Sequence, residues 1–329
     1  MKIDIFPHIL PVKYMESLHK VMGSKFFIQT HAALPTLFDL DYRFRIMDKY
    51  EGLMQVLTIG LYNEPVEKVA GPKKAIDLAK LANDEMAELV SKYPDRFAAA
   101  VACLPMSNID AALDEIDRAI KDLKFRGIQM YTPISDKPMD SPEFMPIYEK
   151  MNQYNLPIWI HPERGPDYPD YRSEKTSKYT MHGILGWPYE TSVAMCRLVL
   201  SGILEKYPNL KFITHHAGAM IPYLEKRLTG WIDGQGISQR ANLKRPTLEY
   251  FKMFYADTAL YGHTSGLMCC YDFFGAQHIL FATDMPYDNQ FGLKYTRETI
   301  ESIERMAISD AEKKMIFEDN ARSLLRLAV

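Results

Sequence analysis

Short runs of β-forming residues recur along the whole chain and predict eight strands. Each run consists mainly of apolar, β-branched or aromatic side chains and is bounded by glycine, proline or polar residues. The clearest run, at 210–214, follows Pro208 and Asn209 and leads into two histidines. The predicted strands are Lys2–Phe6, Met54–Leu61, Ala98–Leu104, Gly127–Tyr131, Pro157–His161, Lys211–His215, Met253–Asp257 and His278–Thr283.

Apolar residues at helical spacing fill most of the intervals between these runs. After the two histidines, for example, Met220, Ile221, Leu224 and Leu228 share one face of a helix. The predicted helices are Lys73–Tyr93, Ile109–Leu123, Met145–Tyr154, Thr191–Lys206, Ile221–Ile232, Ser265–Phe274, Leu293–Arg305 and a closing helix near Asp310–Leu327.

This alternation of strands and helices predicts an α/β protein. Eight strand–helix repeats in a chain of this length most simply form one (β/α)8 TIM barrel, so we expect residues 1–329 to be a single domain. Residues 7–40 are too long for an ordinary connection, and we expect them to be a small capping insertion after the first strand. A second long segment, at 162–188, is expected to lie over the barrel mouth as well.

Histidine and aspartate stand at the ends of four predicted strands. His8 follows the first strand, His161 ends the fifth, His215 and His216 come at the end of the sixth, and Asp284 follows the eighth. The carboxyl ends of parallel strands meet at one end of a barrel, so we expect these side chains to converge. A single histidine at a strand end is more often structural, but imidazole and carboxylate together bind divalent metals or move protons at neutral pH. The joint pattern therefore predicts a catalytic site.

The overall composition limits the partners that the protein can have. The chain is 47% apolar, carries a formal net charge of −3 and has no cluster of basic residues. These features argue against binding to nucleic acid or to an anionic membrane. The first residues contain no apolar run long enough for a signal or a membrane span, and the four cysteines lack CxxC spacing. We therefore expect reduced thiols and a cytoplasmic protein.

Seven motifs occur in order along nearly the whole chain. They are DIFPHILP at 4–11, PIWIHPE at 157–163, GWPYETS at 186–192, HHAGAMIPYLEKR at 215–227, YADTA at 255–259, FATDMPY at 281–287 and NARSLL at 320–325. Together they resemble the amidohydrolase-related family of the amidohydrolase superfamily, which is typified by aminocarboxymuconate-semialdehyde decarboxylase and has hydroxybenzoate-type decarboxylases as relatives. The resemblance implies a barrel with one divalent metal ion at its mouth, held by residues after strands 1, 5 and 8. It also implies that a histidine after strand 6 assists the chemistry.

Position 6 departs from the family pattern. The family usually has His-x-His or Glu-x-His after the first strand, whereas this chain has Phe6, which cannot bind a metal. The resemblance leaves His8, His161 and Asp284 as metal ligands beside His216, with zinc or manganese as the expected ion. Three protein ligands and a water are enough for a catalytic site, but the loss of one ligand predicts weaker binding. The alternative is a site that has lost its metal and works through histidine and aspartate alone.

Four further residues are candidates for contact with a substrate. Arg227 matches the position from which the family sends an arginine across a dimer interface to the substrate carboxylate, so the resemblance implies a homodimer. Trp187 is a candidate wall of an aromatic pocket, Glu163 follows a predicted metal ligand, and Asp257 ends the seventh strand. The alternatives are a surface charge for Arg227, lid packing for Trp187, a solvated loop for Glu163, and a cap or a partner of His216 for Asp257.

These features predict a non-oxidative decarboxylase that acts on a small carboxylated aromatic or unsaturated acid. His216 and Asp284 are expected to take part in proton transfer. One alternative is a metal-dependent hydrolase or hydratase of an amide, ester, lactone or C–C bond, since the same residues could activate water. Another is a ligand-binding pseudoenzyme, which Phe6 favours and which the three ionisable groups His161, His216 and Asp284 oppose.

Overall fold

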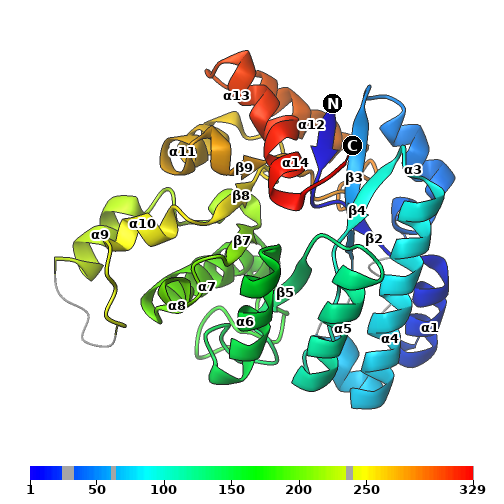
Figure 1. Ribbon diagram of the computed structural model, residues 1–329, viewed down its shortest axis with the longest axis horizontal. Helices are drawn as coiled ribbons and strands as arrows, with labels where there is room; N and C mark the ends of the chain where they lie inside the picture. The colour runs from blue at the N-terminus through cyan, green and yellow to red at the C-terminus, as the bar shows by residue number, and fades with distance from the viewer. Residues whose placement is uncertain (24–32, 61–63, 235–239, 329) are drawn as a thin grey trace.

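The strands of the protein form two parallel sheets (Figure 1). The computed structural model describes residues 1–23, 33–60, 64–234 and 240–328. One sheet has the order β1-β3-β2, with β4 also paired to β3, and the other has the order β5-β6-β7-β8-β9. The strands are β1 (Lys2–Asp4), β2 (His8–Ile9), β3 (Leu53–Ile59), β4 (Phe97–Ala100), β5 (Ile128–Thr132), β6 (Pro157–Pro162), β7 (Lys211–Thr214), β8 (Tyr255–Asp257) and β9 (Ile279–Leu280).

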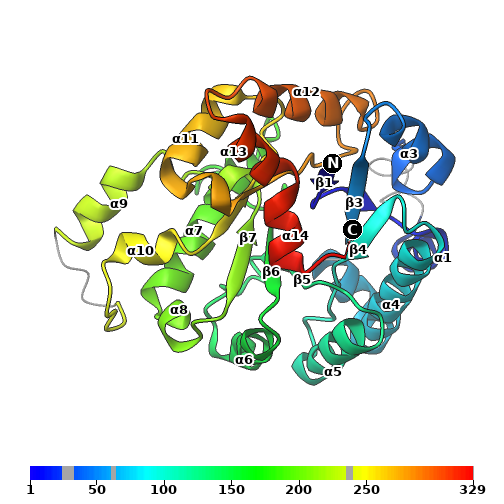
Figure 2. The same cartoon turned by 45° about the horizontal axis from the view of Figure 1, so that its top comes forward.

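Helices surround the strands on the outside (Figures 1 and 2). They are α1 (Val12–Met22), α3 (Leu40–Met47), α4 (Glu64–Lys92), α5 (Ile109–Lys121), α6 (Met145–Tyr154), α7 (Trp187–Leu200), α8 (Ile203–Lys206), α9 (Glu225–Ile232), α10 (Thr247–Phe251), α11 (Thr264–Phe274), α12 (Leu293–Glu304), α13 (Asp310–Lys314) and α14 (Asn320–Leu325). The result is an α/β fold that resembles a TIM barrel.

Each of the eight predicted strands overlaps an observed strand. The predicted strand Met54–Leu61 identified β3 correctly because all seven residues of β3 are buried, as expected for a parallel strand covered on both faces. Leu61, the predicted end of that strand, lies outside the described residues. The sequence did not predict β2, in which His8 pairs with Thr58 of β3. His8 is therefore part of the sheet and not of the loop expected there.

Hydrogen bonds join the two sheets at both of their edges. On one side, Ala102 bridges Ile128 at the start of β5. On the other, the amide of Ile5 donates to the carbonyl of Phe281 over 3.0 Å. The chain just after β4 therefore pairs with β5, and the chain just after β1 is bonded to the chain just after β9; we call these two junctions the seams between the sheets.

An inner apolar cluster lies between the strands. Trp159 of β6 is fully buried in it and donates an indole hydrogen bond of 3.0 Å to the carbonyl of Ile5. Gly127 leaves room for this ring, since a Cβ there would lie 2.5 Å from the indole. Leu324 and Leu325 of α14 belong to the same cluster, and Figure 2 shows α14 crossing in front of the strands.

Several predicted helices have different bounds in the structure. The segment 191–206 is divided into α7 and α8 by Gly202, which adopts a left-handed conformation with a φ of 79°. The helix predicted from Ile221 begins only at Glu225. Residues 221–224 form turns instead, and the chain before them has His216, Ala217 and Ala219 at positive φ, so an α-helix cannot extend back toward the strand.

The two segments expected to cover the mouth differ in structure. The first contains α1, which packs along α4, where the Glu85 carboxylate accepts a hydrogen bond from the Lys13 amide. Residues 24–32 of this segment lie outside the described residues. In the second segment, the Trp187 indole donates to the carbonyl of Arg164 over 3.2 Å. The covering role of both segments stays a prediction.

No helix within the described ranges is long and apolar enough to cross a membrane. All four cysteines are described and none is paired in a disulfide.

Candidate active site

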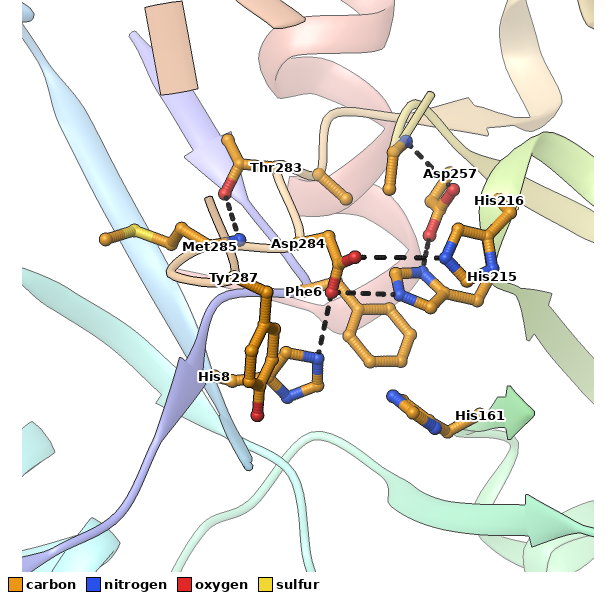
Figure 3. Close-up of polar contacts among 12 residues, drawn as sticks. Phe6, His8, His161, His215, His216, Asp257, Thr283, Asp284, Met285 and Tyr287 are labelled. Carbon is orange, nitrogen blue, oxygen red and sulfur yellow. Dashed lines mark hydrogen bonds and ion pairs between the residues drawn. The ribbon is translucent and has the colours of Figure 1, made fainter. Parts of the chain in front are cut away.

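The side chains from four strand ends meet at one point (Figure 3). The Nε2 atoms of His8 and His215 each lie 3.3 Å from the same Asp284 oxygen, Oδ1. His216 Nε2 lies 3.8 Å from the other oxygen, Oδ2. His161 completes the cluster, since its ring centre is 5.3 Å from that of His8 and 5.4 Å from that of His215. The predicted convergence of these five residues is therefore observed.

The Nδ1 atoms of three histidines face hydrogen-bond acceptors. His8 Nδ1 lies 3.4 Å from the Ile59 carbonyl and 3.3 Å from the Thr58 hydroxyl, which donates its own proton to the Pro7 carbonyl over 3.0 Å. His161 Nδ1 lies 2.8 Å from the Pro162 carbonyl. His215 Nδ1 is hydrogen-bonded to the Asp257 carboxylate. We therefore assign the proton to Nδ1 in each ring, which leaves Nε2 to bind a metal or a proton.

The donor atoms fit a divalent metal ion. Two sets of three possible ligand atoms, each set lying within 4.8 Å, are formed by His8, His161 and His215 and by His215, His216 and Asp284. Among the residues that the structure describes, the buried Nε2 atoms of His8 and His215 make no well-aligned hydrogen bond, and each has only the 3.3 Å contact with Asp284 Oδ1. Buried polar atoms that are poorly satisfied are costly, and a bound ion would satisfy both of them.

Phe6 lies directly against this cluster. Its ring is fully buried and stacks on His215 with centres 4.1 Å apart and an angle of 21° between the planes. The same ring is 5.4 Å from His8 and 5.8 Å from His161 (Figure 3). An apolar ring therefore occupies the side of the cluster from which the family pattern would supply a ligand.

Tyr261 connects the two residues expected to transfer protons. Its hydroxyl donates to Asp284 Oδ2 over 3.1 Å and lies 3.4 Å from His216 Nε2. The Tyr261 ring is 44% exposed and packs against Tyr295 of α12, with ring centres 4.5 Å apart. Nothing in the sequence indicates this residue beyond its place after the predicted seventh strand, observed as β8.

The histidines determine the charge of Asp284. Burial alone would raise the pKa of this carboxyl, but His215, His216 and His8 together hold its pKa well below the ordinary range. Burial likewise opposes protonation of His215, yet Asp257 and Asp284 raise its pKa to about 10. Asp284 is thus a carboxylate in the resting protein and accepts hydrogen bonds.

Burial keeps His161 and His216 neutral. Burial, followed by the neighbouring His8, lowers the pKa of His161 well below its usual value. Burial, followed by His215, lowers the pKa of His216 in the same direction. Neutral imidazoles keep a lone pair and can bind a metal or accept a proton.

The backbone is strained at two of the reactive positions. His216 has a φ of 56° and Asp284 a φ of 58°, a left-handed conformation that costs a non-glycine residue about 1–3 kcal/mol. Asp257 Oδ1 holds the first turn in place by accepting hydrogen bonds of 3.0 Å and 3.1 Å from the amides of Ala217 and Ala259. Strain of this kind is common where side chains must be aimed at a ligand.

Outer contacts hold the two ends of the cluster. The Asp4 carboxylate accepts hydrogen bonds from the Thr283 amide and hydroxyl, at 3.1 Å and 2.6 Å. The buried Arg43 guanidinium donates to the carbonyl of His8. Tyr287 places its ring 5.3 Å from that of His8 and donates to the Gly60 carbonyl over 3.1 Å. Asp4 and Tyr287 lie within the motifs at 4–11 and 281–287, whereas nothing in the sequence indicated Arg43.

The predicted substrate residues lie at different distances from the cluster. The Trp187 ring centre is 6.2 Å from that of His161. Burial raises the pKa of Glu163 to about 8, and its Oε2 has no hydrogen-bond partner within the described part of the chain. Asp257 is fully buried and pairs with His215 instead of the predicted His216.

Arg227 lies apart from these residues, on the peripheral helix α9 (Figure 1). Its guanidinium is 5.7 Å from the ring centre of Trp231. Both residues line an apolar groove of about 360 Å³ between α7 and α9, together with Cys196, Leu200, Leu224, Leu228 and Ile232.

Known proteins resemble this chain over most of its length. A family model described as amidohydrolase matches residues 8–327. The gamma-resorcylate decarboxylase of Polaromonas sp. strain JS666 is 31% identical over 297 residues, which cover 87% of each chain. The 2-amino-3-carboxymuconate-6-semialdehyde decarboxylase of Dictyostelium discoideum is 26% identical over 349 residues, covering 99% of this chain and 92% of that protein.

Solved structures agree with these similarities. The crystal structure of a dihydroxybenzoic acid decarboxylase from Polaromonas sp. JS666 has a TM-score of 0.78 at 26% identity and covers 99% of this chain and 96% of that one. That structure contains manganese and the inhibitor 2-nitroresorcinol. The family resemblance predicted from the seven motifs is therefore confirmed.

Proposed function

The chain belongs to the amidohydrolase family, and on that premise we propose that it is a non-oxidative decarboxylase of carboxylated hydroxyaromatic acids. The observation that carries the proposal is the convergence of His8, His161, His216 and Asp284 from separate strands. Relatives named as decarboxylases cover most of the chain, so the likeness is not confined to one motif.

We propose that the two parallel sheets close into one (β/α)8 barrel and that residues 1–329 form a single domain. The hydrogen bonds at both seams and the inner cluster around Trp159 support this arrangement. In such a barrel, the residues of the site lie at the carboxyl ends of the strands, and residues 7–40 and 162–188 cover the mouth.

His8, His161 and Asp284 would hold a divalent ion in this site. Manganese is the first candidate because a homologous structure contains it, and imidazole with carboxylate suits zinc as well. When bound, the ion supplies positive charge that stabilises negative charge on the oxygen atoms of the substrate.

The reaction requires a proton at the carbon that carries the carboxylate. His216 is the residue that we assign to this transfer, because Asp284 is held as a carboxylate. The resting His216 ring is neutral, so it first takes up a proton from solvent and then donates it to the carbon. Once the carbon is protonated, the bond to the carboxylate breaks, its electron pair returns to the ring, and CO₂ leaves. His216 is then neutral again, so the sum is substrate anion plus one proton to product plus CO₂. The Tyr261 hydroxyl donates a hydrogen bond to Asp284 and lies 3.4 Å from His216 Nε2, so it fixes the position of these two groups relative to each other.

The substrate carboxylate needs a cation, and Arg227 is the candidate from the family pattern. In its own subunit Arg227 lies on the peripheral α9, so this role requires a second copy of the chain. Trp231 of α9 and Tyr223, which precedes α9 in the chain, are 52% and 83% exposed, and large exposed aromatic side chains are of the kind that subunit interfaces use. We therefore propose a homodimer that joins through this face.

The test is a direct assay for CO₂. Purified protein supplied with Mn²⁺ is incubated with gamma-resorcylate, other hydroxybenzoates and carboxymuconate-type acids, and CO₂ release is measured. We expect release from at least one hydroxybenzoate, and we expect Asp284→Asn to fold but to lose the activity. Release of an alcohol or amine from esters, lactones or amides, with no CO₂ from any acid, would favour the hydrolase alternative.

A further inference from the structure

We propose that His215 is the fourth protein ligand of the divalent ion and replaces the ligand that position 6 has lost. The inference rests on the metal site of the proposed function, and it concerns a residue outside the ligand pattern of the family. Its evidence is the geometry around Asp284, and its test measures metal binding instead of decarboxylation.

His215 points at the position that a shared ligand set requires. Its Nε2 and that of His8 both lie 3.3 Å from Asp284 Oδ1, and among the described residues neither buried nitrogen makes a well-aligned hydrogen bond. The nitrogen atoms of His8, His161 and His215 lie within 4.8 Å of one another. His215 also belongs to the second set, with Asp284, so it is the histidine that the two sets have in common.

The outer contacts of His215 are those of a metal ligand. A ligating histidine usually donates its other ring nitrogen to a carboxylate or a carbonyl, which fixes the tautomer and the ring. His215 Nδ1 does so with Asp257, as His161 Nδ1 does with the Pro162 carbonyl. His216 is arranged in the opposite way, since its Nε2 faces Tyr261 and its buried Nδ1 has no partner in the described ranges.

Phe6 and His215 form a complementary pair. The Phe6 ring stacks on His215 at 4.1 Å with 21° between the planes, so it supports the ligand and excludes water from one face. Both rings are buried, and Figure 3 shows Phe6 beside His215 and below Asp284. Position 6 supplies no ligand atom in this chain, and the imidazole of His215 reaches the same cluster from the end of β7.

The resulting donor set is chemically sound. Three imidazole nitrogens with one carboxylate oxygen suit zinc, manganese or a similar divalent ion. Any proton on His215 Nε2 is released to solvent when the ion binds, so the charges balance. With His215 the ion has four protein ligands, as many as the family pattern supplies, so we expect no loss of metal affinity. With His8, His161 and Asp284 alone, the weaker binding predicted from the sequence is expected.

The experiment compares neighbouring histidines. Metal-free full-length protein is titrated with Mn²⁺ against a chelator of known affinity, and the bound ion is counted by elemental analysis. We expect one ion per chain, and we expect His215→Ala to weaken binding by more than about 100-fold, beyond the range for losing an outer partner. The matched control His216→Ala is expected to change the affinity by less than about tenfold.

A compensating variant keeps the test decisive if His215→Ala fails to fold. Phe6→His combined with His215→Ala restores the family arrangement. We expect this double variant to bind Mn²⁺ at least about tenfold more tightly than His215→Ala alone. Asp257→Asn removes only the outer partner of His215 and is expected to weaken binding by about 10- to 100-fold.

Two results would overturn the inference. One is His215→Ala or Asp257→Asn binding Mn²⁺ as the unaltered protein does. The other is unaltered protein that binds no divalent ion. If CO₂ release persists in either case, the ligand assignment fails while the proposed function stands; if the metal binds as expected and no acid loses CO₂, the reverse holds.

Discussion

Replacing Tyr261 by phenylalanine tests whether its hydroxyl fixes the position of the Asp284 carboxylate relative to the His216 ring. The hydroxyl donates to Asp284 Oδ2 over 3.1 Å, and His216 Nε2 is 3.8 Å from that oxygen. The phenylalanine ring can keep the packing on Tyr295, so the change removes one hydrogen bond and little else.

The size of the effect follows from the charge of the acceptor. A hydrogen bond to a charged group contributes about 1.5–3 kcal/mol. If all of it acts in the transition state, kcat falls by about 10- to 150-fold, since about 1.4 kcal/mol corresponds to a factor of ten. KM should change less, because the hydroxyl orients the proton-transfer residues and does not hold the substrate.

The assay measures kcat and KM for CO₂ release, together with the thermal unfolding midpoint. Tyr295→Phe is the matched control, since it removes a hydroxyl from the same aromatic pair without touching the Asp284 hydrogen bond. A Tyr261→Phe enzyme that keeps the kcat of the control would refute the positioning role. So would an equal loss of kcat in both variants.

Three further predictions concern other parts of the protein. Burial raises the pKa of Glu67 to about 7 in the folded state, above 4.5, so the folded protein keeps a proton that the unfolded chain loses, and stability falls as pH rises through about 7. Glu67→Gln cannot ionise at this position, so its stability should not fall in this way. Between pH 5 and pH 9 the unfolding free energy of the variant minus that of the unaltered protein should increase by at most about 3 kcal/mol. A difference that stays constant with pH in denaturant titrations would contradict this prediction. Arg227→Ala should raise KM for a carboxylate substrate while sedimentation still detects the dimer, and an unaltered KM would remove Arg227 from the substrate site. Thorough chelation should abolish CO₂ release, and Mn²⁺ should restore it; full activity in protein shown to be metal-free would exclude a catalytic ion.

The strands were predictable because of where they lie. Runs such as 53–59 are apolar throughout, since parallel strands are buried on both faces, and the same argument places His161 and Asp284 at one end. β2 was missed because Pro7 precedes it and only two residues pair. The break between α7 and α8 depends on the left-handed Gly202, which helical periodicity does not reveal.

The site was predictable only where strand ends or motifs carried it. His215 stands in the motif at 215–227, but the family pattern assigns a role in that motif to His216. Only the structure shows that His215 Nε2 lies 3.3 Å from Asp284 Oδ1. Tyr261 reaches Asp284 from the loop after β8, and Arg43 reaches the carbonyl of His8 from α3. Contacts of this kind depend on tertiary packing, which local patterns do not encode.

Isotope labelling tests the central claim most directly. With a hydroxybenzoate that the enzyme consumes, the reaction is run in D₂O and the product is analysed by NMR and mass spectrometry. The account predicts one equivalent of CO₂ and one deuterium at the carbon that lost the carboxylate, with His216→Ala folding normally and giving neither. Turnover in H₂¹⁸O that places labelled oxygen in the product, with no CO₂ formed, would contradict it and identify a hydrolase.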